Sequence, residues 1–153
     1  MIRLENISKS YHSNFDLEVL KNINFFCDSS KIFTIYGNSG TGKTTLLNIL
    51  GLIDKPSSGY VYINNKKINN YRNISSLRVK TFGYVFQDHY LFPEFTVLEN
   101  LVLPSIIIGD NKHNFALKLL DRFNLKALKD KYPRSISFGE AQRIAVLRSI
   151  INK

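Results

Sequence analysis

Residues 37–44 combine residue types and a spacing that suit the binding of phosphate groups. They read Gly-Asn-Ser-Gly-Thr-Gly-Lys-Thr and match the pattern G-x-x-x-x-G-K-[ST]. Small residues let the backbone curl until successive N–H groups point at phosphate oxygens. Lys43 can reach the terminal phosphates, and the Thr44 hydroxyl can join the ligands of a Mg²⁺ ion. The predicted nucleotide-binding set comprises Gly37, Asn38, Ser39, Gly40, Thr41, Gly42, Lys43, Thr44 and Thr45.

The segments on either side of this loop have the character that such a site requires. Residues 32–36 form a short β-prone run, and residues 45–50 have the composition of a helix start. The helix N-terminus would add its partial positive charge beneath the phosphates. The alternative, a glycine-rich turn with a chance lysine, does not account for both flanks.

Length and composition indicate a globular domain. The chain has 153 residues, of which 44% are hydrophobic and 22% charged, so we expect one domain over residues 1–153 with a sizeable core. No apolar run approaches the length of a membrane span, and the N-terminus lacks the apolar core of a signal peptide. The single cysteine, Cys27, excludes an internal disulfide and fits a reducing compartment.

The formal net charge of +9 would suit a polyanionic partner, but the lysines form no stripe with aromatic residues between them. We therefore expect a solvated basic surface and no nucleic-acid partner. The three histidines, His12, His89 and His113, lack zinc-ligand spacing, and we expect them at the surface.

Periodicity predicts a β-rich first part. Alternating or β-prone composition indicates strands at residues 2–7, 19–25, 60–63 and 82–86. The polar segment that joins the first two strands carries one aromatic residue, Tyr11. Asn64 and Asn65 can adopt the positive φ values of a tight hairpin turn.

Helices are predicted in the second part. Thr96 to Glu99 and Ser137 to Glu140 have the form of capping boxes, which open helices. Apolar spacing predicts an amphipathic helix over residues 112–123 and another after Ser137. The expected buried stripes are Phe115, Leu119, Leu120 and Phe123 on the first helix, and Ile144, Leu147 and Ile151 on the second.

A further group of motifs follows the phosphate-binding loop. Gln87 closes the strand predicted at 82–86, and Ser137-Phe138-Gly139-Glu140 precedes Ala141-Gln142-Arg143. In type and order these motifs resemble the ATP-binding subunit of ABC transporters. That family has an aromatic loop, a Walker A loop, a glutamine loop and an L-S-G-G-Q/E signature followed by Gln-Arg. The resemblance covers essentially the whole chain.

The resemblance implies an α/β fold, with a RecA-like P-loop NTPase core, an antiparallel β subdomain and an α-helical signature subdomain. The approximate subregions are residues 1–87 for the β-rich core, 88–136 for the helical subdomain and 137–153 for the signature helix. The pair Leu103-Pro104 and the run at 132–135 look like the branch of lipoprotein-release and macrolide-export ATPases.

The resemblance also implies roles for individual residues. Tyr11 would stack on adenine, and Gln87 would contact the metal and the attacking water and face the membrane partner. Thr44 and Gln87 would be the Mg²⁺ ligands. The signature residues, which would contact the ATP of a second subunit, are Ser137, Phe138, Gly139 and Glu140.

The implied cofactors are ATP and Mg²⁺. The implied partners are a second ATP-binding subunit in a head-to-tail dimer and transmembrane permease subunits. The implied location is the cytoplasmic face of the cell membrane. A packed loop aromatic is the alternative for Tyr11, and a simple capping box is the alternative for Ser137 to Glu140.

Phe138 departs from the family pattern, which has glycine at this position. Phenylalanine restricts positive φ and adds bulk beside the phosphate. We therefore expect a weakened contact with the ATP of the second subunit.

Residues 1–153 contain no apolar strand that ends in Asp-Glu after the signature, where the family holds Mg²⁺ and activates water. Asp88 is a weak substitute because Gln87 separates it from its strand. We expect a core that is incomplete at its C-terminus, with an unpaired edge beside the P-loop strand. The isolated chain should then be marginally stable and bind ATP without hydrolysing it.

Three functions remain open. The first is an ABC-type ATPase subunit that couples ATP-driven dimerisation and hydrolysis to transport by a membrane partner. The second is a non-catalytic nucleotide-binding remnant of such a subunit. The third is another P-loop kinase or GTPase, for which the sequence offers neither a convincing arginine-bearing lid nor an N-K-x-D motif.

Overall fold

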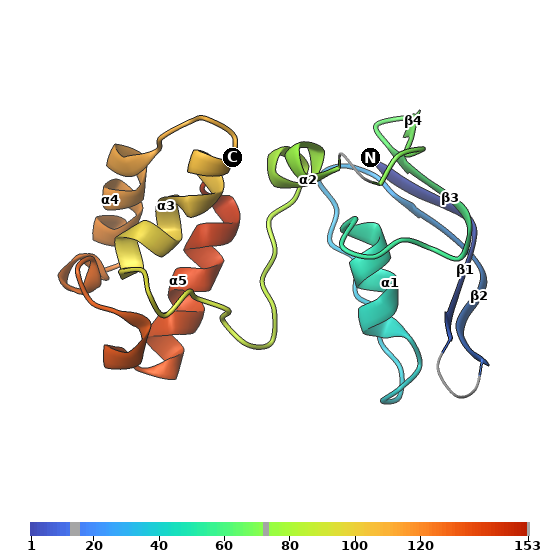
Figure 1. Ribbon diagram of the computed structural model, residues 1–153, viewed down its shortest axis with the longest axis horizontal. Helices are drawn as coiled ribbons and strands as arrows, with labels where there is room; N and C mark the ends of the chain where they lie inside the picture. The colour runs from blue at the N-terminus through green and yellow to red at the C-terminus, as the bar shows by residue number, and fades with distance from the viewer. Residues whose placement is uncertain (13–15, 72–73, 153) are drawn as a thin grey trace. The chain divides into compact units, whose positions relative to one another are not determined.

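The computed structural model describes residues 1–12, 16–71 and 74–152, which form two compact units, Met1–Ile74 and Ser75–Lys153 (Figure 1). The first unit contains a β-sheet and the helix that follows the phosphate-binding loop. The second unit is helical.

The first unit is built on a four-stranded antiparallel sheet in the order β2-β1-β3-β4. Its strands are β1 (Ile2–His12), β2 (Asp16–Cys27), β3 (Ser58–Ile63) and β4 (Lys66–Lys67). The strands predicted at residues 2–7, 19–25 and 60–63 are confirmed as parts of β1, β2 and β3. Tyr11 lies on a strand and not in a polar connection, because it pairs with Leu17 and β1 continues to pair with β2 as far as His12 and Asp16. The tip of that predicted connection, residues 13–15, lies outside the described residues.

Helix α1 (Lys43–Leu50) covers one face of this sheet (Figure 1). Alternate strand residues point to that face, as period-two geometry requires. Their burial against α1 and the turn after it supplies the hydrophobic stabilisation of the unit. The buried apolar residues are Leu4, Ile7, Leu20, Ile49, Leu50, Leu52, Val61, Ile63 and Ile74.

Two tight backbone features shape the β3 region. Asn64 and Asn65 have φ of 48° and 63°, which confirms the predicted hairpin turn. Gly59 has φ of 87°, and a Cβ there would lie 2.3 Å from the carbonyl oxygen of Asn6. Glycine is required at this position by both its conformation and its contact with β1.

Two predicted strands are wrong. Residues 32–36 and 82–86 have no regular secondary structure. A strand forms only where its N–H and C=O groups pair with a neighbouring strand, and neither segment pairs in this way with any described residue. Ile32 and Tyr36 are accordingly 98% and 90% exposed. Their composition is β-prone, but composition does not supply a pairing partner.

The second unit contains four α-helices and two short 3₁₀ turns among its described residues. The elements are α2 (Ser75–Thr81), α3 (Val97–Ile107), α4 (His113–Arg122), η1 (Lys126–Leu128), η2 (Pro133–Ser135) and α5 (Phe138–Ile150). In the described ranges no helix combines the length and the apolar character that crossing a membrane requires.

The predicted capping box of α3 is confirmed. The backbone N–H of Thr96 donates to Glu99 Oε2 at 2.7 Å, and the backbone N–H of Glu99 donates to Thr96 Oγ1 at 3.2 Å. The two bonds satisfy two backbone donors at the start of the helix.

The core of the second unit forms between α3, α4 and α5. The stripe predicted on the last helix is confirmed, because Ile144, Leu147 and Ile151 are all buried. The stripe predicted on α4 is half wrong. Leu119 and Leu120 are buried, but Phe115 and Phe123 are 39% and 42% exposed, and Ala116 completes the buried face instead.

Gly83 allows the segment after α2 to touch the end of α5. A Cβ on Gly83 would lie 1.9 Å from the carbonyl oxygen of Ser149, which is a backbone atom and cannot rotate away. We expect Gly83→Ala to destabilise the unit by about 2–3 kcal/mol, the upper range for overpacking. Urea unfolding followed by circular dichroism measures this cost.

The matched control is Gly139→Ala in the first turn of α5, where a Cβ would meet nothing within 4 Å. Alanine is a better helix former than glycine, so this variant should be neutral or slightly stabilising. Equal unfolding midpoints for the two variants would show that the contact of Gly83 with Ser149 carries no cost.

Candidate nucleotide-binding site

The phosphate-binding loop turns sharply before α1. Gly40 and Gly42 have φ of 80° and 86°, in the left-handed region that glycine adopts without strain. Gly42 also packs on β2, where a Cβ would lie 3.0 Å from the carbonyl oxygen of Val19 and 2.9 Å from Leu20 Cδ2. Both the curl of the loop and its contact with the sheet therefore require these glycines.

Two side chains of the motif close the loop on itself. The Nζ of Lys43 donates to the carbonyl oxygen of Asn38. Thr41 Oγ1 donates to the same oxygen at 2.9 Å. The Lys43 ammonium is thus held across the loop before any ligand arrives, close to where the motif places phosphate oxygens.

The loop leaves backbone donors available. Among the described residues, the N–H groups of Gly40, Gly42 and Lys43 have no protein acceptor. These donors stand at the N-terminus of α1, where the helix dipole favours negative charge. Several N–H groups without protein acceptors, together with an ammonium, suit an anion with several oxygens.

Tyr11 lies near the loop along the sheet. Gly42 packs on Val19 of β2, and Tyr11 of β1 pairs with Leu17, which is two residues before Val19 on β2. Tyr11 is 41% exposed, so its ring is not packed away. Its hydroxyl donates to Asp54 Oδ2 at 2.9 Å. The structure brings Tyr11 and the loop together in one unit.

Gln87 lies in the second unit, with an exposed side chain. Its backbone is held by α5, because Gln142 Nε2 donates to the carbonyl oxygens of Phe86 at 3.0 Å and Gln87 at 3.1 Å. The glutamine loop is therefore attached to the helix that begins at the signature.

Arg148, which follows Gln142 on α5, makes a second attachment to the same segment. Its Nη1 and Nη2 donate to the carbonyl oxygens of Tyr90 and His89, each at 2.7 Å. Burial lowers the pKa of the Arg148 guanidinium from its ordinary value. The sequence analysis singled out Gln142 with Arg143 as the Gln-Arg pair after the signature, but it did not single out Arg148. The contacts of Gln142 and Arg148 could not be predicted, because they depend on a segment more than fifty positions away.

The signature residues begin α5, as predicted. Ser137 is the N-cap, and its backbone N–H and its Oγ both donate to Glu140 Oε2 at 2.8 Å. The backbone N–H of Glu140 donates back to Ser137 Oγ at 3.3 Å. The backbone and then the side-chain hydrogen bond from Ser137 lower the pKa of Glu140. Without a ligand, the Ser137 hydroxyl is thus engaged by a carboxylate.

The limited access of phenylalanine to positive φ does not matter at Phe138, because the backbone there does not need it. Phe138 is the first residue of α5 and does not have a positive φ. Its bulk does lie at the helix start, because the side chain is 62% exposed and its ring is 6.0 Å from that of His89. Gly139 has open space where a Cβ would be.

The sequence pattern of the ABC transporter family matches residues 20–153. The chain belongs to the ABC transporter family. It is 42% identical over 156 residues to the lipoprotein-releasing system ATP-binding protein LolD of Blochmanniella floridana, across 96% of this chain and 65% of that protein. It is 40% identical over 158 residues to LolD of Bacteroides fragilis, across 100% of this chain and 72% of the relative.

The chain thus spans about two-thirds of the length of these ABC relatives. A dimeric structure of the ATP-binding cassette MJ0796, in a post-hydrolysis state bound to ADP and Pi, is similar with a TM-score of 0.90. The two chains are 35% identical, and the similarity covers 99% of this chain and 70% of that one.

These similarities confirm the α/β P-loop NTPase fold with an antiparallel β subdomain and a helical subdomain. They also confirm the likeness to lipoprotein-release ATPases that Leu103-Pro104 and residues 132–135 indicated. The chain is therefore an ABC-type ATP-binding protein, and the kinase or GTPase interpretation is wrong.

Proposed function

We propose that this chain is the ATP-binding subunit of an ABC transporter, which binds MgATP and couples ATP-driven dimerisation and hydrolysis to a membrane partner. The observation that carries the proposal is the set of available N–H groups at the start of α1, crossed by the Lys43 ammonium. ATP would occupy residues 37–45, with its adenine on Tyr11. A triphosphate satisfies all of these donors at once, whereas water would have to satisfy them singly.

Thr44 and Gln87 are the proposed protein ligands of Mg²⁺. Both side chains are exposed and each offers an oxygen, the donor that Mg²⁺ prefers. No cluster of three or more His, Cys, Asp or Glu side chains suited to a metal ion occurs in the described part of the chain. Phosphate oxygens and water would therefore complete the shell. When bound, the ion neutralises charge on the phosphates.

Ser137, Phe138, Gly139 and Glu140 are proposed to contact the ATP held by a second subunit. The dimeric structure of the similar cassette MJ0796 supports such pairing. The start of α5 suits an anion, but the Glu140 carboxylate already accepts the Ser137 hydroxyl. The incoming phosphate must take this hydrogen bond from Glu140.

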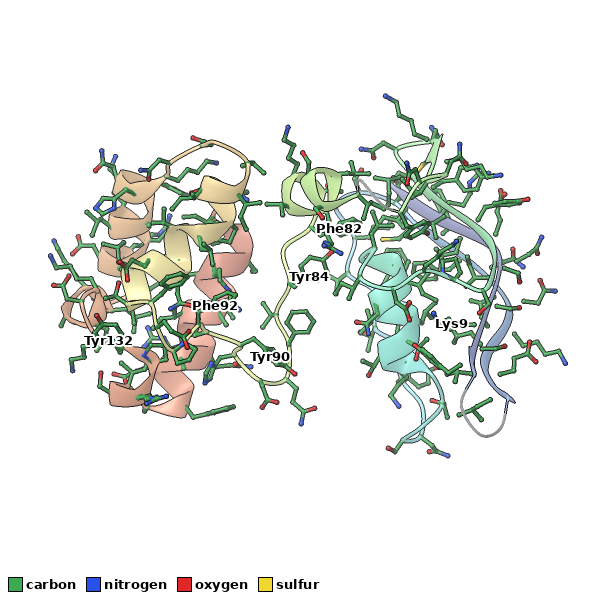
Figure 2. All side chains as sticks on the ribbon, in the orientation of Figure 1. Lys9, Phe82, Tyr84, Tyr90, Phe92 and Tyr132 are labelled. Atoms are coloured by element: carbon green, nitrogen blue, oxygen red, sulfur yellow. The ribbon has the colours of Figure 1, made fainter. Side chains whose placement is uncertain are left out.

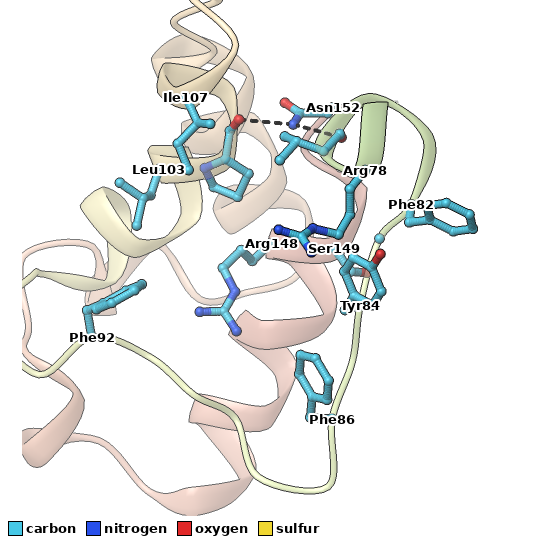
Figure 3. A pocket seen from close by; sticks show the side chains of 13 residues that line it. Arg78, Phe82, Tyr84, Phe86, Phe92, Leu103, Ile107, Arg148, Ser149 and Asn152 are labelled. Atoms are coloured by element: carbon cyan, nitrogen blue, oxygen red, sulfur yellow. Dashed lines mark hydrogen bonds between the residues drawn. The ribbon is translucent and has the colours of Figure 1, made fainter. Parts of the chain in front are cut away.

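A groove in the helical unit is proposed to receive the permease (Figure 3). It has a volume of about 260 Å³. Aromatic side chains of the segment before Gln87 form one wall, and Leu103 and Ile107 of α3 form another, with Arg148 beside them. An apolar groove with a few cationic groups suits an amphipathic helix with acidic residues. Because the relatives belong to lipoprotein-releasing systems, we propose a partner of that kind at the cytoplasmic face of the membrane.

ATP hydrolysis is proposed for this subunit, with Gln87 as a contact of the attacking water. Residues 1–153 include no Asp-Glu pair after an apolar strand. Hydrolysis is thus proposed for the subunit by its family, whereas residues 1–153 alone are proposed to bind ATP without turnover. A non-catalytic nucleotide-binding remnant would behave in the same way.

Calorimetric titration of the chain with MgATP, MgADP and AMP tests the proposed site. ATP and ADP should bind, and AMP should bind far more weakly, because the loop recognises the β- and γ-phosphates. Equal affinity for all three nucleotides, or no binding of ATP, would refute a phosphate-directed site.

Replacing the aromatic residue of the signature should strengthen pairing. We expect Phe138→Gly to tighten MgATP-dependent dimerisation several-fold, because the exposed ring no longer stands beside the phosphate. The substitution should lower the stability of α5 by up to about 1 kcal/mol, because glycine is a poor helix former. Sedimentation velocity with and without MgATP measures this. The control is Phe115→Gly, which removes a partly exposed phenylalanine from the first turn of α4. An unchanged dimerisation constant for Phe138→Gly would show that the ring does not hinder the contact.

A further inference from the structure

The hydroxyl of Tyr11 is attached to the carboxylate of Asp54. Tyr11 donates to Asp54 Oδ2 at 2.9 Å, and Lys9 Nζ donates to Asp54 Oδ1 at 2.8 Å. Burial raises the pKa of the Asp54 carboxyl, but hydrogen bonds from Lys9, Tyr11 and the backbone N–H of Lys55 outweigh burial and hold the pKa below its ordinary value. The carboxylate therefore stays ionised at neutral pH and keeps accepting both bonds.

Lys9 lies over the ring of Tyr11. Its Nζ is 4.8 Å from the ring centroid and also donates to the carbonyl oxygen of Lys55 at 2.7 Å. The Lys9 side chain is only 12% exposed. Figure 2 shows it on the side of the sheet that α1 covers. A tyrosine held at its hydroxyl and on one face still offers its exposed part for stacking.

The attachment begins on the helix that carries the phosphate-binding loop. Asp54 follows α1, and its backbone N–H donates to the carbonyl oxygen of Asn48 on that helix at 3.2 Å. At the other end of α1, Gly42 packs on Val19 of β2, and β2 pairs with β1, the strand that carries Tyr11. The loop and the ring are thus fixed to one helix and one pair of strands.

We propose that Lys9 and Asp54 are positioning residues of the nucleotide site, which hold the Tyr11 ring in the orientation that stacks on the base. They would set how much the nucleoside adds to the affinity of the phosphate chain. The inference rests on the proposed function, because it needs ATP at residues 37–45. A ring that is fixed before binding loses little conformational freedom when the base arrives, so its stacking contributes more to affinity.

Calorimetric titration of the full chain with MgATP and with inorganic tripolyphosphate and Mg²⁺ tests this role. Asp54→Asn and Lys9→Met should weaken MgATP binding about three- to tenfold, the range of a lost hydrogen bond, and leave tripolyphosphate affinity unchanged. Tyr11→Phe, which loses only the hydroxyl, should behave in the same way. Tyr11→Ala should weaken MgATP binding about 5- to 100-fold, because it removes the stacking surface.

The matched control is Lys67→Met. Lys67 Nζ lies 3.2 Å from the ring centroid of Tyr60, but on β4, at the opposite edge of the sheet from β2. This variant should leave both affinities unchanged. Thermal melting by circular dichroism checks that each variant is folded.

Two results would overturn the positioning role. One is wild-type MgATP affinity in Asp54→Asn and Lys9→Met when Tyr11→Ala is weakened. The other is equal weakening of MgATP and tripolyphosphate, which would indicate a general structural role for the two residues. Failure of the wild-type chain to bind tripolyphosphate is a distinct outcome, because it would overturn the proposed nucleotide site itself and this inference with it.

Discussion

Lys43→Met is expected to weaken MgATP binding by about 10- to 150-fold. The factor corresponds to the roughly 1.5–3 kcal/mol of a hydrogen bond to a charged group. In the chain without ligand, the Lys43 ammonium spans the loop and donates to the carbonyl oxygen of Asn38. Phosphate oxygens replace that neutral acceptor with charged ones, so binding gains from the exchange. Calorimetric titration at saturating Mg²⁺ measures the loss.

The control for this change is Lys31→Met, which removes the charge of an exposed lysine in the same unit. It should alter MgATP affinity less than twofold, because exposed charges outside a site are screened by salt. If both variants lost the same affinity, the effect would come from net charge and not from the loop. Unchanged affinity in Lys43→Met would refute the assignment of the triphosphate to residues 37–45.

Asn100→Leu is expected to destabilise the helical unit by about 3–5 kcal/mol. The side chain of Asn100 is fully buried on α3. Its Oδ1 accepts from the backbone N–H of Phe92 at 2.7 Å, and its Nδ2 donates to the carbonyl oxygens of Phe92, Phe95 and Thr96, each at 3.0 Å.

Leucine has the same branched set of side-chain heavy atoms but leaves the N–H of Phe92 and the carbonyl of Phe95 without these partners. Each unsatisfied buried group costs about 1–3 kcal/mol. The total is a large share of the roughly 5–15 kcal/mol by which a domain is stable. Phe92 also lines the groove proposed for the permease, so the same change should disturb that surface.

Urea unfolding followed by circular dichroism measures the effect of Asn100→Leu. Asn114→Leu is the control, because it makes the same chemical change at an exposed position of α4 and should stay within about 0.5 kcal/mol of wild type. Coincident unfolding curves for the two variants would show that the buried amide contributes nothing.

Features that depend on a few neighbouring residues were predictable from the sequence. The phosphate-binding loop, the hairpin turn at Asn64 and Asn65 and the capping boxes at Thr96 and Ser137 are all present. Each is made by residues close together in the sequence, so residue type and spacing are sufficient to specify it.

Predictions of strands and buried faces were less secure. Residues 32–36 and 82–86 are β-prone, yet they form no strand in the described structure because pairing needs a distant backbone. On α4, the apolar character of Phe115 suggested burial, but the packing of α4 against its neighbours buries Ala116 instead.

The family motifs of this chain could be identified from the sequence alone, because the chemistry of phosphate binding restricts which residues can occupy adjacent positions. The contacts that hold the motif residues in place could not be predicted from the sequence. Asp54 reaches Tyr11 across forty-three positions, and Gln142 reaches Gln87 across fifty-five. Such contacts join segments that have no local pattern in common. They exist only because burial of the apolar faces brings the segments together, and that is the contribution of tertiary structure.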